Sequence, residues 1–254
     1  MSTSSEHKFG VLYIVTGDNY LNAAIKSARS VRKYAPELGI HLFTGDVNYP
    51  RLLENKSIFD SIEKIEKPHR RSKVEYLNKS PFERTLYLDS DTEVVAPIFD
   101  LFEVLDAFDL ALCHAHVRNH PRTLMTWKQE FPRSFPQFNG GVILYKCNPK
   151  TTDFFEQWAT AFEQAGFAQD QVTLRETLWN SDLRMYTLPP EYNVRFWKYL
   201  YLWNAKEVMP RILHMQKYHD GPFWFLKNWA KAVGRPIARM FGFLPSQKRK
   251  KENR

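Results

Sequence analysis

The order of the first three apolar segments constrains the fold more than any other feature. Residues 11–15 (VLYIV) form a short apolar run that is typical of a strand. Residues 20–34 then carry apolar side chains near helical spacing, and residues 40–43 (IHLF) are again strand-like. A strand, a helix and a strand joined by short connections predict parallel strands with a right-handed crossover. We therefore expect an α/β domain.

Similar segments follow along the chain. The pattern predicts strands at residues 85–88, 110–113, 142–145, 185–188 and 212–214, and helices at residues 71–78, 151–166 and 169–179. Residues 119–136 hold three prolines and are predicted to form a long surface loop. The predicted fold is a single Rossmann-like α/β domain with a mixed, mainly parallel central sheet flanked by helices. It occupies residues 1–222, and residues 223–254 form a basic, aromatic C-terminal tail.

Composition and charge narrow the class of protein. The chain has 254 residues, of which 43% are hydrophobic, enough for a sizeable core. A net charge of +8 suits nucleic acid, an anionic membrane or a phosphate-bearing substrate. The two cysteines, Cys113 and Cys147, adjoin strand-like runs and are expected to be free thiols. No secretory leader or membrane-spanning run is evident, so we predict a cytoplasmic protein, either free or peripheral on a membrane surface.

An Asp-x-Asp pair carries the strongest chemical signal. Asp89 and Asp91 follow the apolar strand at 85–88, and residues two apart in an extended chain face the same side. Paired carboxylates repel each other unless a cation lies between them, and Mg²⁺ or Mn²⁺ bound in this way is usually completed by substrate phosphates. A solvated acidic turn is the alternative interpretation. The position at a carboxyl strand end, where open α/β sheets bind ligands, favours the metal.

Five segments in order carry a resemblance to a known family. They read ERTLYLDSDTEVV, FNGGVILY, AQDQVTL, LPPEYN and ILHM. Together with the opening VLYIVTGDNY they resemble the GT-A glycosyltransferases, in particular the glycogenin and lipopolysaccharide-galactosyltransferase type. The resemblance covers roughly residues 10–215. It implies a GT-A domain, a nucleotide-diphospho-sugar donor and a divalent metal.

The resemblance also implies roles for individual residues. Asp89, Asp91 and His214 match the metal ligands, and an imidazole beside two carboxylates favours Mn²⁺ over Mg²⁺. Asp170 and Gln171 match the pair that lines the sugar and acceptor site, which we take as the catalytic pair. Donor-binding positions are Thr16, Gly17, Tyr20, Lys73, Asp89, Ser90, Asn139, Gly140, Gly141 and Lys217.

Three of these assignments have alternatives. The family often has a Gly-Lys-Pro-Trp cluster soon after the metal histidine, but no lysine directly precedes Pro222 here, so Lys217 is taken as its substitute. His219 is a second candidate ligand, and we prefer His214 because it ends a predicted strand. Asp170 could instead cap the helix that follows it.

The predicted function is transfer of a sugar, of hexosyl type and UDP-linked in the donor, to an acceptor hydroxyl on a glycan or a lipid-linked acceptor. The resemblance implies retention of configuration. A sugar nucleotidyltransferase is one alternative, although TGDNYLN is not the glycine-rich loop of that class. A non-catalytic basic binding module is another. A nucleic-acid partner is not expected, because no recognition motif is present.

The tail has its own pattern. Lys227, Lys231, Arg235 and Arg239 recur every four residues, behind three aromatic residues at 223–225. A cationic stripe beside apolar side chains is typical of helices that lie in a bilayer interface. We therefore predict contact with an anionic membrane surface. A solvated tail packed partly on the domain is the alternative.

Overall fold

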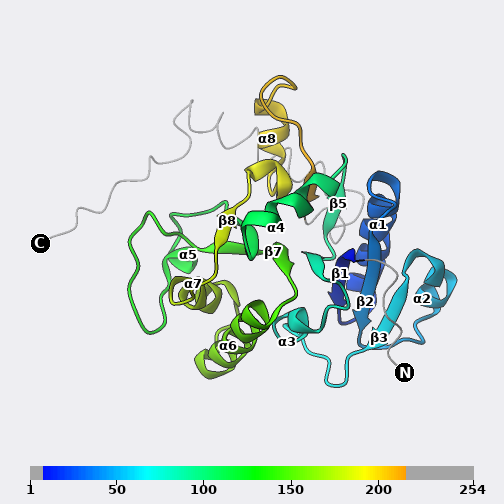
Figure 1. Cartoon of the computed structure of the whole chain (residues 1–254), viewed down its shortest axis with the longest axis horizontal. Coiled ribbons are helices and arrows are strands. Elements are labelled where there is room, and N and C mark those ends of the chain that lie inside the picture. The colour runs from blue at the N-terminus through cyan, green and yellow to red at the C-terminus, as the bar shows by residue number, and fades with distance from the viewer. Residues whose placement is uncertain (1–7, 216–254) are drawn as a thin grey trace, which may run out of the picture. The chain divides into compact units, whose positions relative to one another are not determined.

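The computed structural model describes residues 8–215 of the chain, with Trp197 and Tyr201 described by their backbone alone (Figure 1). The strands are β1 (Phe9–Val15), β2 (Gly39–Thr44), β3 (Ser61–Lys64), β4 (Arg84–Leu88), β5 (Thr92–Val94), β6 (Leu110–His114), β7 (Phe138–Lys146), β8 (Met185–Thr187) and β9 (Ile212–His214). The α-helices are α1 (Asp18–Tyr34), α2 (Pro50–Glu54), α3 (Lys73–Tyr76), α4 (Val104–Ala107), α5 (Pro121–Leu124), α6 (Pro149–Ala165), α7 (Gln171–Trp179) and α8 (Trp197–Leu202). Four 3₁₀ turns accompany them, η1 (Lys56–Ile58), η2 (Leu77–Lys79), η3 (Phe99–Glu103) and η4 (Pro190–Tyr192).

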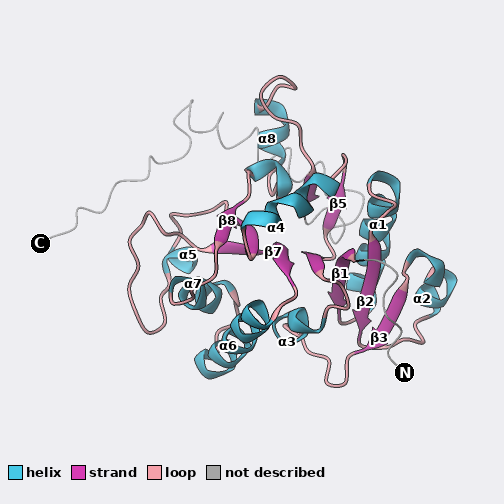
Figure 2. Ribbon diagram, in the orientation of Figure 1, coloured by secondary structure: helices cyan, strands magenta, loops and turns pink. Residues whose placement is uncertain are grey.

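The central sheet has seven strands in the order β3-β2-β1-β4-β7-β6-β8 (Figure 2). Its neighbours pair in parallel except at β7, which runs antiparallel to both β4 and β6. A second, two-stranded sheet joins β5 to β9. The predicted mixed, mainly parallel sheet is confirmed. Because β7 is reversed, its amino end lies at the same edge as the carboxyl ends of β4 and β6.

Helices cover both faces of the sheet, as strand periodicity requires. Along β1, the side chains of Val11 and Tyr13 face a core cluster that includes residues of α1 and α4. Leu12, between them, belongs to the opposite cluster, built from residues of α3, α6 and α7. Both strand faces are buried, which is why these strands read as continuous apolar runs rather than alternating ones. The result is a three-layer α/β/α domain.

The structure differs from the sequence-based expectations at four places. The predicted helix at 71–78 is the short α3 followed by η2. Residues 119–136 contain the short helix α5 within the loop. Asn139, Gly140 and Gly141 lie inside β7, which begins at Phe138, whereas the sequence placed them before the strand. The strands β3 and β5 were not predicted; β3 exposes most of its side chains, and β5 has three residues.

The cysteines are free thiols, as expected, with Cys113 buried and Cys147 partly buried. Within residues 8–215, no helix is both long and apolar enough to cross a bilayer. The tail at residues 223–254 lies outside the described residues, so the domain boundary at residue 222 stays a prediction.

We expect Trp158 to be essential for docking α6 on α7. It is fully buried, and its indole N–H donates to Thr173 Oγ1 at 3.2 Å and the Asp170 carbonyl at 3.3 Å. Trp158→Ala should lower the free energy of unfolding by about 3–5 kcal/mol, because it leaves a large cavity. Trp158→Phe should cost clearly less. Chemical denaturation measures both, and equal losses would contradict a packing role for the indole.

Candidate active site

Two strand pairings bring the Asp-x-Asp segment and His214 together. The Asp89 N–H donates to the Gly141 carbonyl at 2.8 Å, which continues the β4–β7 ladder into the motif. Immediately downstream, β5 pairs with β9 so that Thr92 lies opposite His214. The Met215 N–H donates to the Asp91 carbonyl at 3.0 Å and extends that ladder. His214 is therefore held against the motif by backbone hydrogen bonds.

Three metal-ligating side chains converge at this point. One ligand atom from each of Asp89, Asp91 and His214 lies within 4.8 Å of the other two. The His214 Nε2 atom is 3.1 Å from Asp91 Oδ1 and 3.6 Å from Asp89 Oδ2. His214 is buried, whereas both carboxylates are partly exposed. This is the set of ligands that the sequence analysis assigned to the metal.

A chain of hydrogen bonds fixes the orientation of the His214 ring. The Gly141 N–H donates to Asn139 Oδ1 at 3.0 Å, and the Asn193 amide group donates to the same oxygen at 3.0 Å. The remaining amide atom of Asn193 is then its oxygen, which lies 2.9 Å from His214 Nδ1. Nδ1 must therefore carry the proton in this contact.

The position of the proton on the His214 ring indicates whether the cluster is suited to bind a metal. In the neutral ring with its proton on Nδ1, the lone pair of Nε2 is directed at the two carboxylates, and a cation between these acceptors would relieve their repulsion. Two carboxylate oxygens and one imidazole nitrogen suit a first-row divalent ion. The residues thus fit a divalent metal, and Asn193 acts as the partner that orients the imidazole ligand.

Gly141 is required by this close packing. A Cβ atom at residue 141 would lie 2.1 Å from His214 Cε1 and 2.6 Å from Asp89 Oδ2, far inside van der Waals contact. At Gly140 the nearest atoms, Asp170 Oδ2 and Lys73 Nζ, would be 3.6 Å away, which is ordinary contact. The two adjacent glycines therefore meet different constraints, and Gly141 alone makes room for the cluster.

A largely buried lysine, Lys73, connects the cluster to Asp170. Lys73 Nζ donates to the Gly140 carbonyl at 2.9 Å and lies 3.3 Å from Asp89 Oδ1. It also lies 3.1 Å from Asp170 Oδ2, an ion pair rather than an aligned hydrogen bond. Arg71 Nη1 approaches the other oxygen of Asp170 at 3.5 Å. Two cations thus compensate a carboxylate that is almost fully buried.

The electrostatics keep these groups charged. Burial alone would lower the pKa of Lys73, but Asp170 and Asp89 outweigh it and the net shift is upward. For Asp170, burial opposes ionisation, yet Lys73 and Arg71 hold its pKa below the usual value. Burial, reinforced by Asp89, raises the pKa of Tyr87 well above its normal value. Its hydroxyl remains protonated and donates to Asp89 Oδ1 at 2.6 Å.

The remaining predicted residues have different positions. Thr16 and Gly17 follow β1, the parallel neighbour of β4, at the same sheet edge as Asp89, and Gly17 has a positive φ of 104°. Tyr20 is 45% exposed, so it is not a core aromatic. Asp170 precedes α7 but makes no side-chain cap hydrogen bond, and Gln171 is the first residue of that helix. Ser90, partly exposed, lies between the two aspartates, and Lys217 and His219 lie outside the described residues.

Sequence reasoning missed four residues of the site. Tyr87 lies two positions before Asp89 on the same strand face, a signal that could have been used. Arg71 precedes Lys73 by two residues, but only the fold brings it to Asp170. Asn193 was quoted in LPPEYN without a role, and the Arg195 guanidinium lies 3.9 Å from Asp91 Oδ2.

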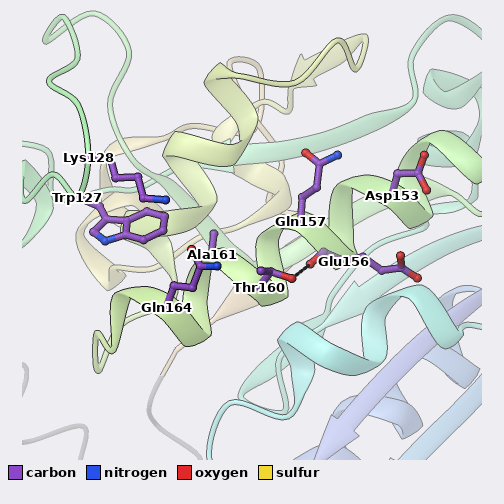
Figure 3. A pocket seen from close by; sticks show the side chains of 8 residues that line it. All are labelled: Trp127, Lys128, Asp153, Glu156, Gln157, Thr160, Ala161 and Gln164. Carbon is purple, nitrogen blue, oxygen red and sulfur yellow. Dashed lines mark hydrogen bonds between the residues drawn. The ribbon is translucent and has the colours of Figure 1, made fainter.

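Two surface hollows differ in their chemistry. One, of about 430 Å³, lies on the outer side of α6 and is lined by Trp127, Lys128, Asp153, Glu156, Gln157, Thr160, Ala161 and Gln164 (Figure 3). None of the predicted site residues lines it.

The other hollow, of about 340 Å³, lies at the carboxyl ends of β6 and β8. It is lined by Cys113, His114, Ala115, His116, Arg118, Thr187, Leu188, Pro190, Tyr199 and Trp203. We call it the β6 pocket.

The β6 pocket adjoins the metal-ligand cluster through the order of the strands. In the sheet, β7 alone separates β4 from β6, and β4 and β6 point in the same direction. Burial lowers the pKa of His116 to about 4, with further lowering by Arg195 and by His214. His116 is therefore within electrostatic reach of the cluster.

A doubly covered α/β sheet with an Asp-x-Asp segment at its carboxyl edge matches the GT-A class of nucleotide-sugar glycosyltransferases. Residues 84–222, more than half of the chain, match the family described as nucleotide-diphospho-sugar transferase, and the chain belongs to that family. This assignment favours glycosyl transfer over the nucleotidyltransferase and the non-catalytic binding module. No curated protein sequence matches the chain significantly.

Solved structures support the fold. The galactosyltransferase LgtC, in complex with donor and acceptor sugar analogues, matches with a TM-score of 0.60 at 16% identity, over 93% of this chain and 96% of LgtC. The glycosyltransferase GlyE of Streptococcus pneumoniae TIGR4 gives a TM-score of 0.65 at 18% identity, over 96% of this chain and 66% of GlyE. Mouse xyloside xylosyltransferase 1 gives a TM-score of 0.55 at 14% identity, over 84% of this chain and 99% of that protein. The GT-A fold is thus confirmed.

Alanine substitution of the two adjacent glycines, Gly140 and Gly141, tests the packing of the cluster with a matched control. Gly141→Ala should weaken Mn²⁺ binding by about tenfold or more, because the new methyl group displaces His214 and Asp89 from each other. Gly140→Ala adds the same methyl group one residue away, where the space is sufficient, and should leave Mn²⁺ affinity nearly unchanged. Electron paramagnetic resonance titration of free Mn²⁺ measures both. Equal affinities in the two variants would contradict the close packing at Gly141.

Proposed function

We propose that the protein transfers a sugar from a UDP-linked nucleotide sugar to a hydroxyl of a glycan acceptor, with Mn²⁺, or alternatively Mg²⁺, as the required metal. The observation that carries this proposal is the convergence of Asp89, Asp91 and His214 beside the Lys73–Asp170 pair. Family membership supports nucleotide-sugar chemistry. LgtC, which shares the fold, binds donor and acceptor sugar analogues, which supports the two-substrate assignment.

Asp89, Asp91 and His214 would hold the metal. When bound, a divalent ion supplies neutralising charge to the diphosphate leaving group. Asn193 keeps the His214 ring in the required tautomer, and the Tyr87 hydroxyl restricts the rotation of the Asp89 carboxylate. These partners fix the ligands before the donor arrives, so less ordering is needed on binding.

We assign the donor to the sheet edge between β1 and β7. Thr16, Gly17 and Tyr20 would bind the nucleoside, since they follow β1 at this edge. Lys73 and the segment at residues 139–141 would bind the diphosphate and sugar, and Ser90 would contribute from between the metal ligands. Lys217 remains part of this proposal, as a diphosphate ligand from the residues that follow β9.

Asp170 and Gln171 are proposed as the pair nearest the transferred sugar. The Asp170 carboxylate is ionised but is neutralised by Lys73 and Arg71, so it is better suited to position sugar hydroxyls than to attack carbon. Gln171, at the start of α7, offers an amide for the same purpose. Retention of configuration is part of the proposal, and analysis of the product anomer tests it.

The acceptor is assigned to the β6 pocket. Its volume of about 340 Å³ is sufficient for a sugar ring, and it lies one strand beyond β7 from the metal ligands. Tyr199 and Trp203 stack with ring centroids 5.4 Å apart, and aromatic faces of this kind pack against the C–H faces of sugars. The donor and acceptor would thus approach each other across the amino end of β7.

The metal requirement has a direct test. Chelation should abolish donor turnover and added Mn²⁺ should restore it. Asp91→Asn should lower turnover about a hundredfold or more, because it removes one ligand charge, while leaving thermal stability near that of the wild type. Asp182→Asn, at a side chain 91% exposed, is the matched control and should retain full turnover. Undiminished turnover in excess chelator would refute the metal assignment.

We also propose that the tail at residues 223–254 binds an anionic membrane surface, which makes a lipid-linked acceptor accessible. The argument is the basic stripe and final basic run of the sequence. The assigned site residues of the described part end at His214, so the tail is not needed to assemble the cluster.

Vesicle sedimentation tests the membrane proposal. The full chain should pellet with anionic vesicles at low salt and less so at high salt, because screening shortens the electrostatic range to about 8 Å at physiological ionic strength. A chain ending at Pro222 should still hydrolyse donor but should stay in the supernatant. Equal pelleting of both chains would contradict a membrane role for the tail.

A further inference from the structure

The β6 pocket presents cations beside its aromatic wall. Arg118 is one of its lining residues and is exposed. Arg195 and Lys198 approach the same neighbourhood, since their charges, together with that of Arg118, act on His116. Lys198 Nζ lies 5.1 Å from the centroid of the Tyr199 ring, which lines the pocket. One cationic side chain, Arg118, therefore lines the pocket, and a second, Lys198, lies against a ring of its aromatic wall.

The carboxylates nearby do not neutralise the positive charges of Arg118 and Lys198. Asp91 is paired with Arg195 at 3.9 Å. Within residues 8–215, no carboxylate lies within ion-pair distance of Arg118 or Lys198. In that part of the chain, no acidic side chain competes with a ligand for these two cations.

The inner part of the pocket offers neutral hydrogen-bonding groups. The Nδ1 atoms of His114 and His116 are buried and lack a hydrogen-bond partner within the described part of the chain. Burial is the main cause of the lowered pKa of both imidazoles, which favours the neutral form of each ring. Neutral ring nitrogens suit sugar hydroxyls, whereas the guanidinium at the mouth suits a phosphate or a carboxylate.

We propose that the acceptor sugar carries an anionic group, a phosphate or a carboxylate, which Arg118 and Lys198 bind at the mouth of the β6 pocket while His114 and His116 bind ring hydroxyls. The proposal rests on the proposed function, because it takes the β6 pocket as the acceptor site. It adds the chemical class of the acceptor: a phosphorylated sugar or a sugar acid in place of a neutral one.

Three sugars that share one ring distinguish the possibilities. Glucose, glucose 6-phosphate and glucuronate differ only at carbon 6, and their binding to the full chain with Mn²⁺ and UDP can be measured by calorimetry. At least one charged sugar should bind about tenfold tighter than glucose, and the difference should shrink as salt rises. If only glucose 6-phosphate binds more tightly than glucose, the acceptor is a phosphorylated sugar. If only glucuronate binds more tightly than glucose, the acceptor is a sugar acid.

Arg118 and Arg122, which lie close together in the sequence, provide a test variant and its matched control. Arg118→Ala should remove most of the preference for the charged sugar, whereas Arg122→Ala, which removes an equal charge from the same loop outside the pocket lining, should keep it. Arg118→Lys should restore part of the preference, which a purely structural role would not predict. Thermal melting of each variant verifies that it is folded.

Two outcomes would overturn the inference. One is that glucose binds as tightly as both charged sugars, and the other is that Arg118→Ala retains the full preference. Failure of the proposed function gives a different result. A wild-type protein that prefers charged sugars but hydrolyses no sugar nucleotide in the presence of Mn²⁺ would contradict the enzymatic assignment and not the anion preference.

Discussion

The close approach of β4 and β7 at Gly141 is the constraint on which the site depends. The backbone of Gly141 receives the N–H of Asp89, and the space where its side chain would be is filled by the His214 ring. The same residue donates its own N–H to Asn139, the first member of the chain of hydrogen bonds that orients His214. One glycine in a reversed strand thus sets the distances among ligands from separate parts of the chain.

Charge balance explains why so many ionisable groups can share this region. Asp89, Asp91 and Asp170 are matched by Lys73, Arg71 and Arg195, each within 4 Å of at least one of the carboxylates. The set is close to neutral without a ligand, so burial of its members is tolerable. A divalent cation would add two positive charges, which the two negative charges of a nucleotide-sugar diphosphate would neutralise. The donor and the metal are therefore expected to bind together more favourably than either does alone.

Much of this fold could be predicted because β1, β2 and β4 are continuous apolar runs and α1 has apolar residues at helical spacing. The strands β3 and β5 could not, because a short or exposed segment becomes a strand through its pairing partner rather than its own propensity. The metal ligands could be proposed from motif and resemblance. Arg71 and Arg195 could not, since their contacts depend on tertiary packing. Gly141 was assigned to the donor, and only the position of the His214 ring reveals the steric reason for a glycine there.

The pairing of β5 with β9 also has a consequence for biosynthesis. β5 directly follows the Asp-x-Asp segment, whereas β9 is the last strand of the described chain. During translation, the two aspartates leave the ribosome long before His214 does, so a nascent chain has an incomplete ligand set. Contacts between residues so distant in sequence form late in folding, because loop closure must precede them. Metal capture would then accompany the final docking of β9, and a bound ion would stabilise the completed domain over its partly folded precursors.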